Sequence, residues 1–155
     1  MSPAEQAFQL PWCGIHHIAL ATADLDATIH FYKDVLGMHV SAIAPSEAGR
    51  GRHCLIFVKP NDDNMWGFHF FERPTAGKTT LGASDNHSPS LVPHVALRLS
   101  HGTAAYTLRD RLNKAYVSIT DIPELGSFVF FDNNDLCLEV TWPKDEVEIV
   151  PVSPL

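Results

Sequence analysis

The 155-residue chain lacks the features of several large classes of protein. Its 11 lysines and arginines are outnumbered by 18 acidic residues, so the formal net charge is −7 and no basic surface is expected for nucleic acid or anionic lipid. Its apolar segments are all shorter than the ~18 residues that a membrane-spanning helix needs. The N-terminal segment has neither the basic nor the apolar stretch of a secretory signal. These absences predict a cytoplasmic protein without a nucleic-acid or membrane partner.

Cysteine is scarce as well. Cys13, Cys54 and Cys137 are odd in number and no two have CxxC spacing, which disfavours a disulfide framework and a thiolate zinc site and favours a reducing compartment. Histidine, in contrast, occurs nine times. Because histidine is the commonest metal ligand in proteins, this composition is compatible with a metal site.

One sequence pattern occurs twice along the chain. The stretch HHIALATADLDATIHFY aligns with PHVALRLSHGTAAYTLR, which pairs His17 with His94 and Ala19 with Ala96. In the first copy, residues 15–22 alternate as a strand, and a helix is expected between an N-cap at Asp24 and a C′ residue at Gly37. In the second copy, a strand is followed by a helix for which Thr103 is the expected cap. Strands are also predicted at 52–59, 65–72, 93–100, 127–131 and 136–142.

This repetition predicts an α+β fold built from two strand–helix–strand modules. The whole chain, residues 1–155, is expected to form one domain, with a first module at 14–75 and a second module at 91–145. Residues 76–90, rich in Gly, Ser, Thr and Pro, are the expected connector. Helices should cover one face of the paired sheets, and the other face should form a cleft that binds a ligand.

Strand parity selects the side chains that should face this cleft. His17 and His94 each alternate with large apolar residues, which belong on the helix side of their strands. Glu139 lies between Leu138 and Val140, where a carboxylate is costly to bury unless it is paired or bound to a cation. In the strand at 65–72, His69 occupies the place that Glu139 holds in its own module. The candidate metal ligands are therefore His17, His69, His94 and Glu139. Imidazole and carboxylate suit Fe, Zn, Ni, Co or Mn as a divalent ion.

Each of these residues also has an ordinary structural interpretation. A single histidine in a strand is more often a hydrogen-bonded core or surface residue than a ligand, and Glu139 would face solvent if its strand lay at an edge. Arg98 is either a binding residue for an anionic group of a substrate or an exposed strand residue. Asp132 is expected to stabilise a turn through its side-chain oxygen. His16 is expected to be a packed or solvated neighbour of His17, and the other five histidines are expected near the surface: His30, His39, His53, His87 and His101.

The stretches that carry a family resemblance are HHIALATADLDATIHFYKDVLGM, PHVAL and FFDNNDLCLEV. Over roughly residues 14–145 the chain resembles the vicinal oxygen chelate superfamily. That superfamily includes glyoxalase I, methylmalonyl-CoA epimerase, extradiol dioxygenases, and fosfomycin and bleomycin resistance proteins. Asn133 and Asp135 replace the proline and glycine of its common DPDGxxxE turn. The resemblance implies two βαβββ modules, a metal on His17, His94 and Glu139, and His69 as the further ligand of several lyases and isomerases. It also implies a homodimer with a site at each interface.

The resemblance further implies an enzyme whose metal, acting as a Lewis acid, chelates a small substrate through two neighbouring oxygens. His69 favours a glyoxalase- or epimerase-like lyase or isomerase, in which Glu139 could also be the catalytic base. An Fe(II)-dependent extradiol-type dioxygenase is the alternative. Two residues count against it: Val129 stands where such enzymes usually carry a tyrosine, and the strand leading to it has Thr120 and no histidine. A metal-free, drug-sequestering resistance protein is the second alternative.

Overall fold

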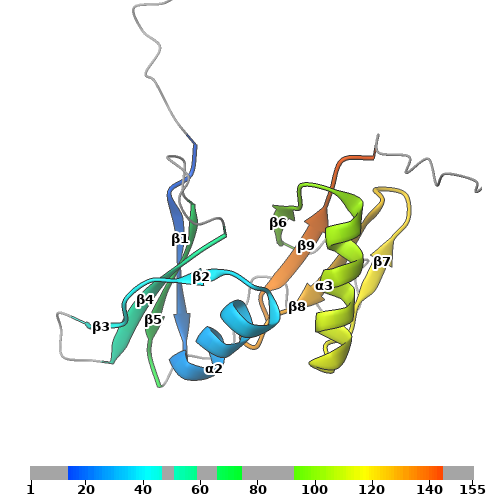
Figure 1. Cartoon of the computed structure of the whole chain (residues 1–155). Coiled ribbons are helices and arrows are strands. Elements are labelled where there is room, and N and C mark those ends of the chain that lie inside the picture. The colour runs from blue at the N-terminus through cyan, green and yellow to red at the C-terminus, as the bar shows by residue number, and fades with distance from the viewer. Residues whose placement is uncertain (1–13, 47–50, 59–65, 75–92, 145–155) are drawn as a thin grey trace, which may run out of the picture.

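The chain folds into two β-sheets that lie side by side (Figure 1). The computed structural model describes residues 14–46, 51–58, 66–74 and 93–144. The whole predicted connector at 76–90, including His87, lies outside the described residues. The first sheet has the strand order β1-β5-β4-β2, with β3 also paired to β4, and the second has the order β6-β9-β8-β7. The α+β class and the division into two similar sheets agree with the sequence prediction.

The first sheet and its helix are built from seven elements: β1 (His17–Thr22), α2 (Leu25–Ile29), the π-helical η1 (His30–Val35), β2 (His39–Val40), β3 (Ala44–Pro45), β4 (Arg52–Phe57) and β5 (Gly67–Glu72). The second sheet contains β6 (Val95–Arg98), α3 (Gly102–Lys114), β7 (Thr120–Ile122), β8 (Ser127–Phe131) and β9 (Cys137–Thr141). The short strands β2, β3 and β7 were not predicted. In each sheet the strand that opens the module pairs in parallel with the strand that closes it, β1 with β5 and β6 with β9.

The first helix begins and ends where the sequence predicts. Asp24 Oδ1 accepts a hydrogen bond from the Ala27 amide at 2.9 Å, and Gly37 has a φ of +78°, which glycine adopts without strain. The second half of the helix differs from the expected α-helix, because the Leu36 amide bonds the Phe31 carbonyl five residues back. This π-helical winding places both Phe31 and Tyr32 in the core.

The predicted cap of the second helix is wrong. Helix α3 begins at Gly102, and His101 Nδ1 accepts the Ala104 amide at 3.2 Å. Thr103 lies inside the helix, where its hydroxyl hydrogen-bonds the same His101 nitrogen. The imidazole nitrogen of His101 thus accepts the amide hydrogen bond that an Asp or Ser oxygen usually accepts at a helix N-terminus. No helix among the described residues is long and apolar enough to span a membrane.

One apolar core joins the two sheets through the first helix. Tyr32 packs against Phe70 of the first sheet, with ring centroids 5.1 Å apart, and Phe31 packs against Phe130 of the second sheet at 6.4 Å. In Figure 1, α2 lies between the two sheets and α3 covers one face of the second. The opposite faces carry the candidate site residues, as strand parity predicts.

The ion pair between Arg52 at the start of β4 and Glu72 at the end of β5 should make the stability of the fold depend on pH. Arg52 Nη2 and Nε donate to Glu72 Oε1 and Oε2 at 2.7 and 3.0 Å, and these hydrogen bonds lower the pKa of the Glu72 carboxyl to about 2. Because this pKa lies below the ordinary value of about 4.3, the pair stabilises the fold above about pH 4, and this contribution is lost as the pH falls towards 2.

We expect the Glu72 pKa, measured by carboxyl-carbon NMR titration, to rise from about 2 towards its ordinary value in Arg52→Gln. The difference in unfolding free energy between wild type and variant should shrink as the pH falls from about 5 to about 2, because protonation of Glu72 removes its ion pair with Arg52 in the wild type. An unchanged Glu72 pKa in the variant would show that Arg52 is not the cause.

Candidate metal centre

The first half of the candidate site lies on the open face of the first sheet. Ile18 and Leu20 pack against the core, whereas His17 and Ala19 are exposed on the other face of β1. His69 lies on β5 directly opposite Ala19, so it shares the face of His17. The parity argument is confirmed for these side chains.

His17 and His69 are in contact. Their ring centroids are 5.4 Å apart in an edge-to-face arrangement. Partial burial, together with His53 and His17, lowers the pKa of His69, so its imidazole favours the neutral form that a metal ligand requires. His16 continues the contacts on the other side, with its Nδ1 2.8 Å from His17 Nδ1.

His53 is a member of this cluster that the sequence analysis missed. It was expected near the surface, but it lies partly buried on β4, and its Nδ1 is 2.9 Å from His69 Nε2. Alternation in 52–57, where Cys54 and Ile56 are buried, could have placed His53 on the open face. Its contact with His69 depends on how β4 pairs with β5, which parity does not determine.

The second half of the candidate site lies on the second sheet. His94 immediately precedes β6, and its Nε2 is 2.9 Å from Glu139 Oε2 on β9. Glu139 is only 8% exposed, and Ser127 donates a hydrogen bond to its Oε1 at 2.5 Å. In the described part of the chain Glu139 forms no ion pair with lysine or arginine. Ser127 was also missed, and nothing in its sequence context distinguishes it.

This pair fits a divalent cation chemically. Two ligand atoms that each lie about 2.0–2.2 Å from one ion, at an angle between a right angle and a tetrahedral one, are about 2.9–3.5 Å apart. The 2.9 Å between His94 Nε2 and Glu139 Oε2 lies at the lower end of this range, and it is also the ordinary length of an N–H···O hydrogen bond. A cation would also neutralise a carboxylate that is buried between apolar neighbours.

The neighbouring cysteine does not belong to the ligand set. Cys137 is buried beside Ile122 and Val129, and burial together with Glu139 raises the pKa of its thiol. Because the thiolate is the form that binds metal, a raised pKa disfavours Cys137 as a ligand. Val129 lies directly opposite Glu139 and brings no hydroxyl to this position.

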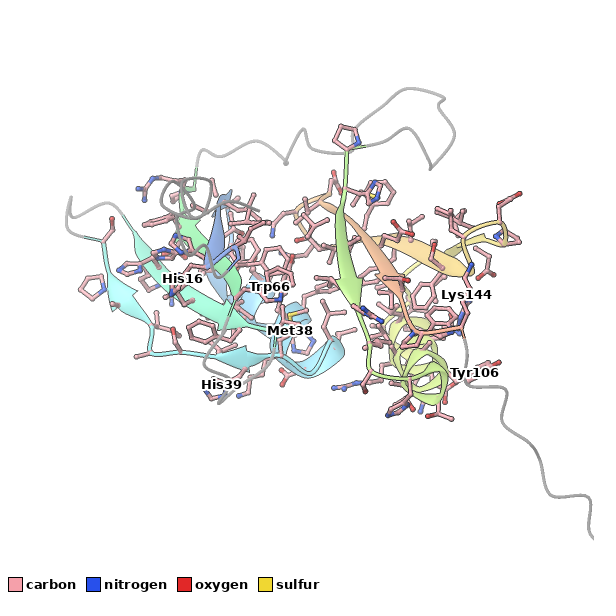
Figure 2. All side chains as sticks on the ribbon, turned by 90° about the horizontal axis from the view of Figure 1, so that it is seen from above. His16, Met38, His39, Trp66, Tyr106 and Lys144 are labelled. Carbon is pink, nitrogen blue, oxygen red and sulfur yellow. The ribbon has the colours of Figure 1, made fainter. Side chains whose placement is uncertain are left out.

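The four predicted ligands occur as two pairs on two different sheets. Within the described ranges, no group of three or more His, Cys, Asp or Glu side chains is placed to hold one metal ion. A cavity of about 560 Å³ is lined by His94, Val95 and Ala96 on one side and by Ile15, Ile18 and Trp66 on the other. Of the four predicted ligands only His94 lines it, because Ile18 and His17 lie on opposite faces of β1. Figure 2 shows Trp66 on the side of the first sheet that faces β6.

Arg98 shares the open face of the second sheet with His94. It is exposed, and its backbone pairs with that of Thr141 on β9. Ala96 lies between Arg98 and His94 along the strand and is opposite Glu139. Arg98 therefore lies on the same face as the His94–Glu139 pair, two strand positions beyond Ala96.

Comparison with known families decides the classification. Residues 14–144 match the Glyoxalase/Bleomycin resistance protein/Dioxygenase superfamily, which covers nearly the whole chain. The chain belongs to this superfamily. The vicinal oxygen chelate resemblance seen in the sequence is thereby confirmed, and the two sheets are its two βαβββ modules. A comparison with curated protein sequences finds no match.

Solved structures of the superfamily share the fold at low sequence identity. A glyoxylase/bleomycin resistance protein/dioxygenase domain from Frankia sp. EAN1pec is 18% identical, with a TM-score of 0.64 over 84% of this chain and 98% of that one. FosX from Listeria monocytogenes, complexed with Mn(II) and sulfate, is 14% identical, with a TM-score of 0.61 over 86% and 94%. The antibiotic-binding protein TnmS3 from Streptomyces sp. CB03234 is 14% identical, with a TM-score of 0.60 over 87% and 99%.

Proposed function

We propose that this chain is a metal-dependent enzyme of the vicinal oxygen chelate superfamily, a lyase or isomerase acting on a small substrate with two neighbouring oxygens. The observation that carries the proposal is the His94–Glu139 pair: a buried carboxylate 2.9 Å from an imidazole nitrogen, with no lysine or arginine paired to it in the described residues. His17 and His69 are the proposed ligands from the first sheet. The ion would be Fe, Zn, Ni, Co or Mn, all of which accept imidazole and carboxylate ligands.

The bound metal would polarise the two chelated oxygens as a Lewis acid. Glu139 is the proposed base that removes a proton next to a carbonyl. Ser127 donates to Glu139 Oε1 and so holds the carboxylate with Oε2 towards His94. Arg98 is proposed to bind an anionic group of the substrate from the same face. The dioxygenase alternative has less support, because Val129 offers no proton donor beside Glu139.

We propose further that the working form is a cytoplasmic homodimer in which each metal site takes one ligand pair from each chain. Support comes from the separation of the ligands into His17 with His69 and His94 with Glu139, which leaves each pair short of the three or more protein ligands that metal enzymes commonly use. In a symmetric dimer the His17–His69 pair of each chain would meet the His94–Glu139 pair of the other chain, which gives two sites.

A second candidate function has an observation of its own. The cavity beside His94 is largely apolar, with Ile15, Ile18, Trp66 and Val95 in its lining, as a site that sequesters an apolar or aromatic drug would be. The structural neighbour TnmS3 is an antibiotic-binding protein, which supports this reading at the level of fold. Under this alternative His94 would contact the drug and the four polar side chains would hold no metal.

The metal content of the purified protein separates the two functions. We expect about one metal ion per chain by mass spectrometry after anaerobic purification, and almost none in His94→Ala, because that variant loses one of the two ligands of the His94–Glu139 pair. Iron would favour oxygen chemistry, whereas zinc, nickel, cobalt or manganese would favour proton transfer.

The control is His39→Ala, which removes an exposed histidine of the first sheet and should leave the metal content unchanged. A wild-type protein that holds no metal after reconstitution and dialysis would overturn the enzyme proposal and leave the drug-binding function.

A further inference from the structure

We propose that His53 is a positioning residue that holds His69 in the tautomer with its proton on Nε2, so that Nδ1 of His69 is left as the ligand atom. The proposal rests on the proposed metal function for the role of His69, but it assigns a task to a residue that this function does not use. The geometry of the two rings carries it.

His53 is held on two sides. Its Nδ1 is 2.9 Å from His69 Nε2, and the ring centroids are 5.0 Å apart. Its other neighbour is Phe71, which lies directly opposite in the β4–β5 register and stacks on the His53 ring at 5.5 Å and 22°. Phe71 also lies 4.1 Å from the His69 ring, so the three rings pack as one unit.

A hydrogen bond between two neutral imidazoles needs a proton on one nitrogen and a lone pair on the other. If His53 Nδ1 carries the proton, His69 Nε2 accepts it and the proton of His69 lies on Nδ1. His69 would then have no nitrogen left for a metal. If His69 Nε2 carries the proton, His53 Nδ1 accepts it and His69 Nδ1 keeps an unshared lone pair.

The second arrangement is favoured by the rings themselves. It places both protons on Nε2, which is the preferred position in neutral histidine, whereas the first arrangement places both on the disfavoured Nδ1. A metal-ligating histidine commonly donates its other N–H to a nearby acceptor, which fixes the ring and its tautomer. Here the acceptor is a second imidazole, and the usual partner, a carboxylate or a carbonyl, is replaced.

The tautomer can be read without metal. In the full-length, metal-free, ¹⁵N-labelled protein at alkaline pH, we expect long-range ¹H–¹⁵N correlation spectra to show a protonated Nε2 and a bare Nδ1 for His69. His53→Ala should remove this preference or turn it into a mixture. His53→Asn, whose amide oxygen lies near the position of Nδ1, should restore it. His39→Ala serves as the control, because it removes an exposed histidine of the same sheet outside the ring contacts.

Zinc affinity supplies the second readout. By titration calorimetry with Zn²⁺, we expect His53→Ala to bind about 10–100-fold more weakly than wild type, with most of the loss recovered in His53→Asn. Melting temperatures of the variants should stay close to one another, because His53 is only partly buried.

The two proposals fail in different ways. A wild-type protein that binds no Zn²⁺ but shows the His53-dependent Nε2–H tautomer overturns the metal function and supports the positioning role. The positioning role is overturned if the proton of His69 lies on Nδ1. It is also overturned if neither the tautomer of His69 nor the Zn²⁺ affinity changes in His53→Ala.

Discussion

Mixing His17→Ala chains with Glu139→Ala chains is expected to restore about a quarter of the wild-type metal content, although neither variant holds metal alone. The expectation follows from the separation of the ligands in the described chain, where His17 contacts His69 and His94 contacts Glu139. If each site joins the first pair of one chain to the second pair of its partner, a mixed dimer combines both intact halves in one of its two sites.

The size of the effect follows from counting. Random association of equal amounts makes half of the dimers mixed, and half of the sites in a mixed dimer are intact, which gives about a quarter of all sites. Purifying the mixed dimer with two affinity tags should raise this to about one metal per two chains. Metal content by mass spectrometry measures both values.

A matched pair of variants provides the control. His94→Ala and Glu139→Ala both damage the same half of the site, so mixing them should restore nothing in either geometry. If the first mixture also stays at the level of its parents, the ligands are not shared between chains. The two sheets of one chain would then have to bring His17, His94 and Glu139 together by closing over the cavity between them.

The faces of the strands could be predicted from sequence because parity is local. The alternation of Ile18 and Leu20 with His17 and Ala19 places each side chain whatever the strand pairs with. The first helix was predictable for the same reason, because the Asp24 cap and the positive φ of Gly37 each depend on residues that are close in sequence. The cap of α3 was not, because histidine rarely serves there.

Contacts that depend on strand pairing could not be predicted. His53 reaches His69 only because β4 and β5 pair in one particular register, with Leu55 opposite His69. The π-helical winding of η1 depends on the core that surrounds Phe31 and Tyr32. The ligand roles of His17, His69, His94 and Glu139 and the substrate-binding role of Arg98 stay predictions. So do the module boundaries and the shared site.

The largest loss of stability is expected from Asp132→Ala, at roughly 3–5 kcal/mol in urea unfolding. The sequence places Asp132 in the turn before β9, and its Oδ1 indeed accepts the Asn134 and Leu136 amides at 2.8 and 2.7 Å. The structure adds Tyr32, whose hydroxyl donates to Asp132 Oδ2 at 2.8 Å from 100 positions away in sequence. Alanine would leave four donors without this acceptor: the Tyr32 hydroxyl, the Asn134 and Leu136 amides, and Asn134 Nδ2, which lies 3.4 Å from Oδ2.

Three further variants separate the parts of this loss. Tyr32→Phe removes a single hydrogen bond and should cost about 1–2 kcal/mol. Asp132→Asn should fall between the two, because it keeps a carbonyl oxygen for the amides and removes a charge whose burial raises the pKa of Asp132. Asp110→Ala, on an exposed face of α3, should stay within about 0.5 kcal/mol. If Asp132→Ala costs no more than Asp110→Ala, Asp132 does not join the first helix to the second sheet. A loss of about 1–2 kcal/mol in Tyr32→Phe would mean that the first helix helps to hold the turn before β9, the strand that carries Glu139.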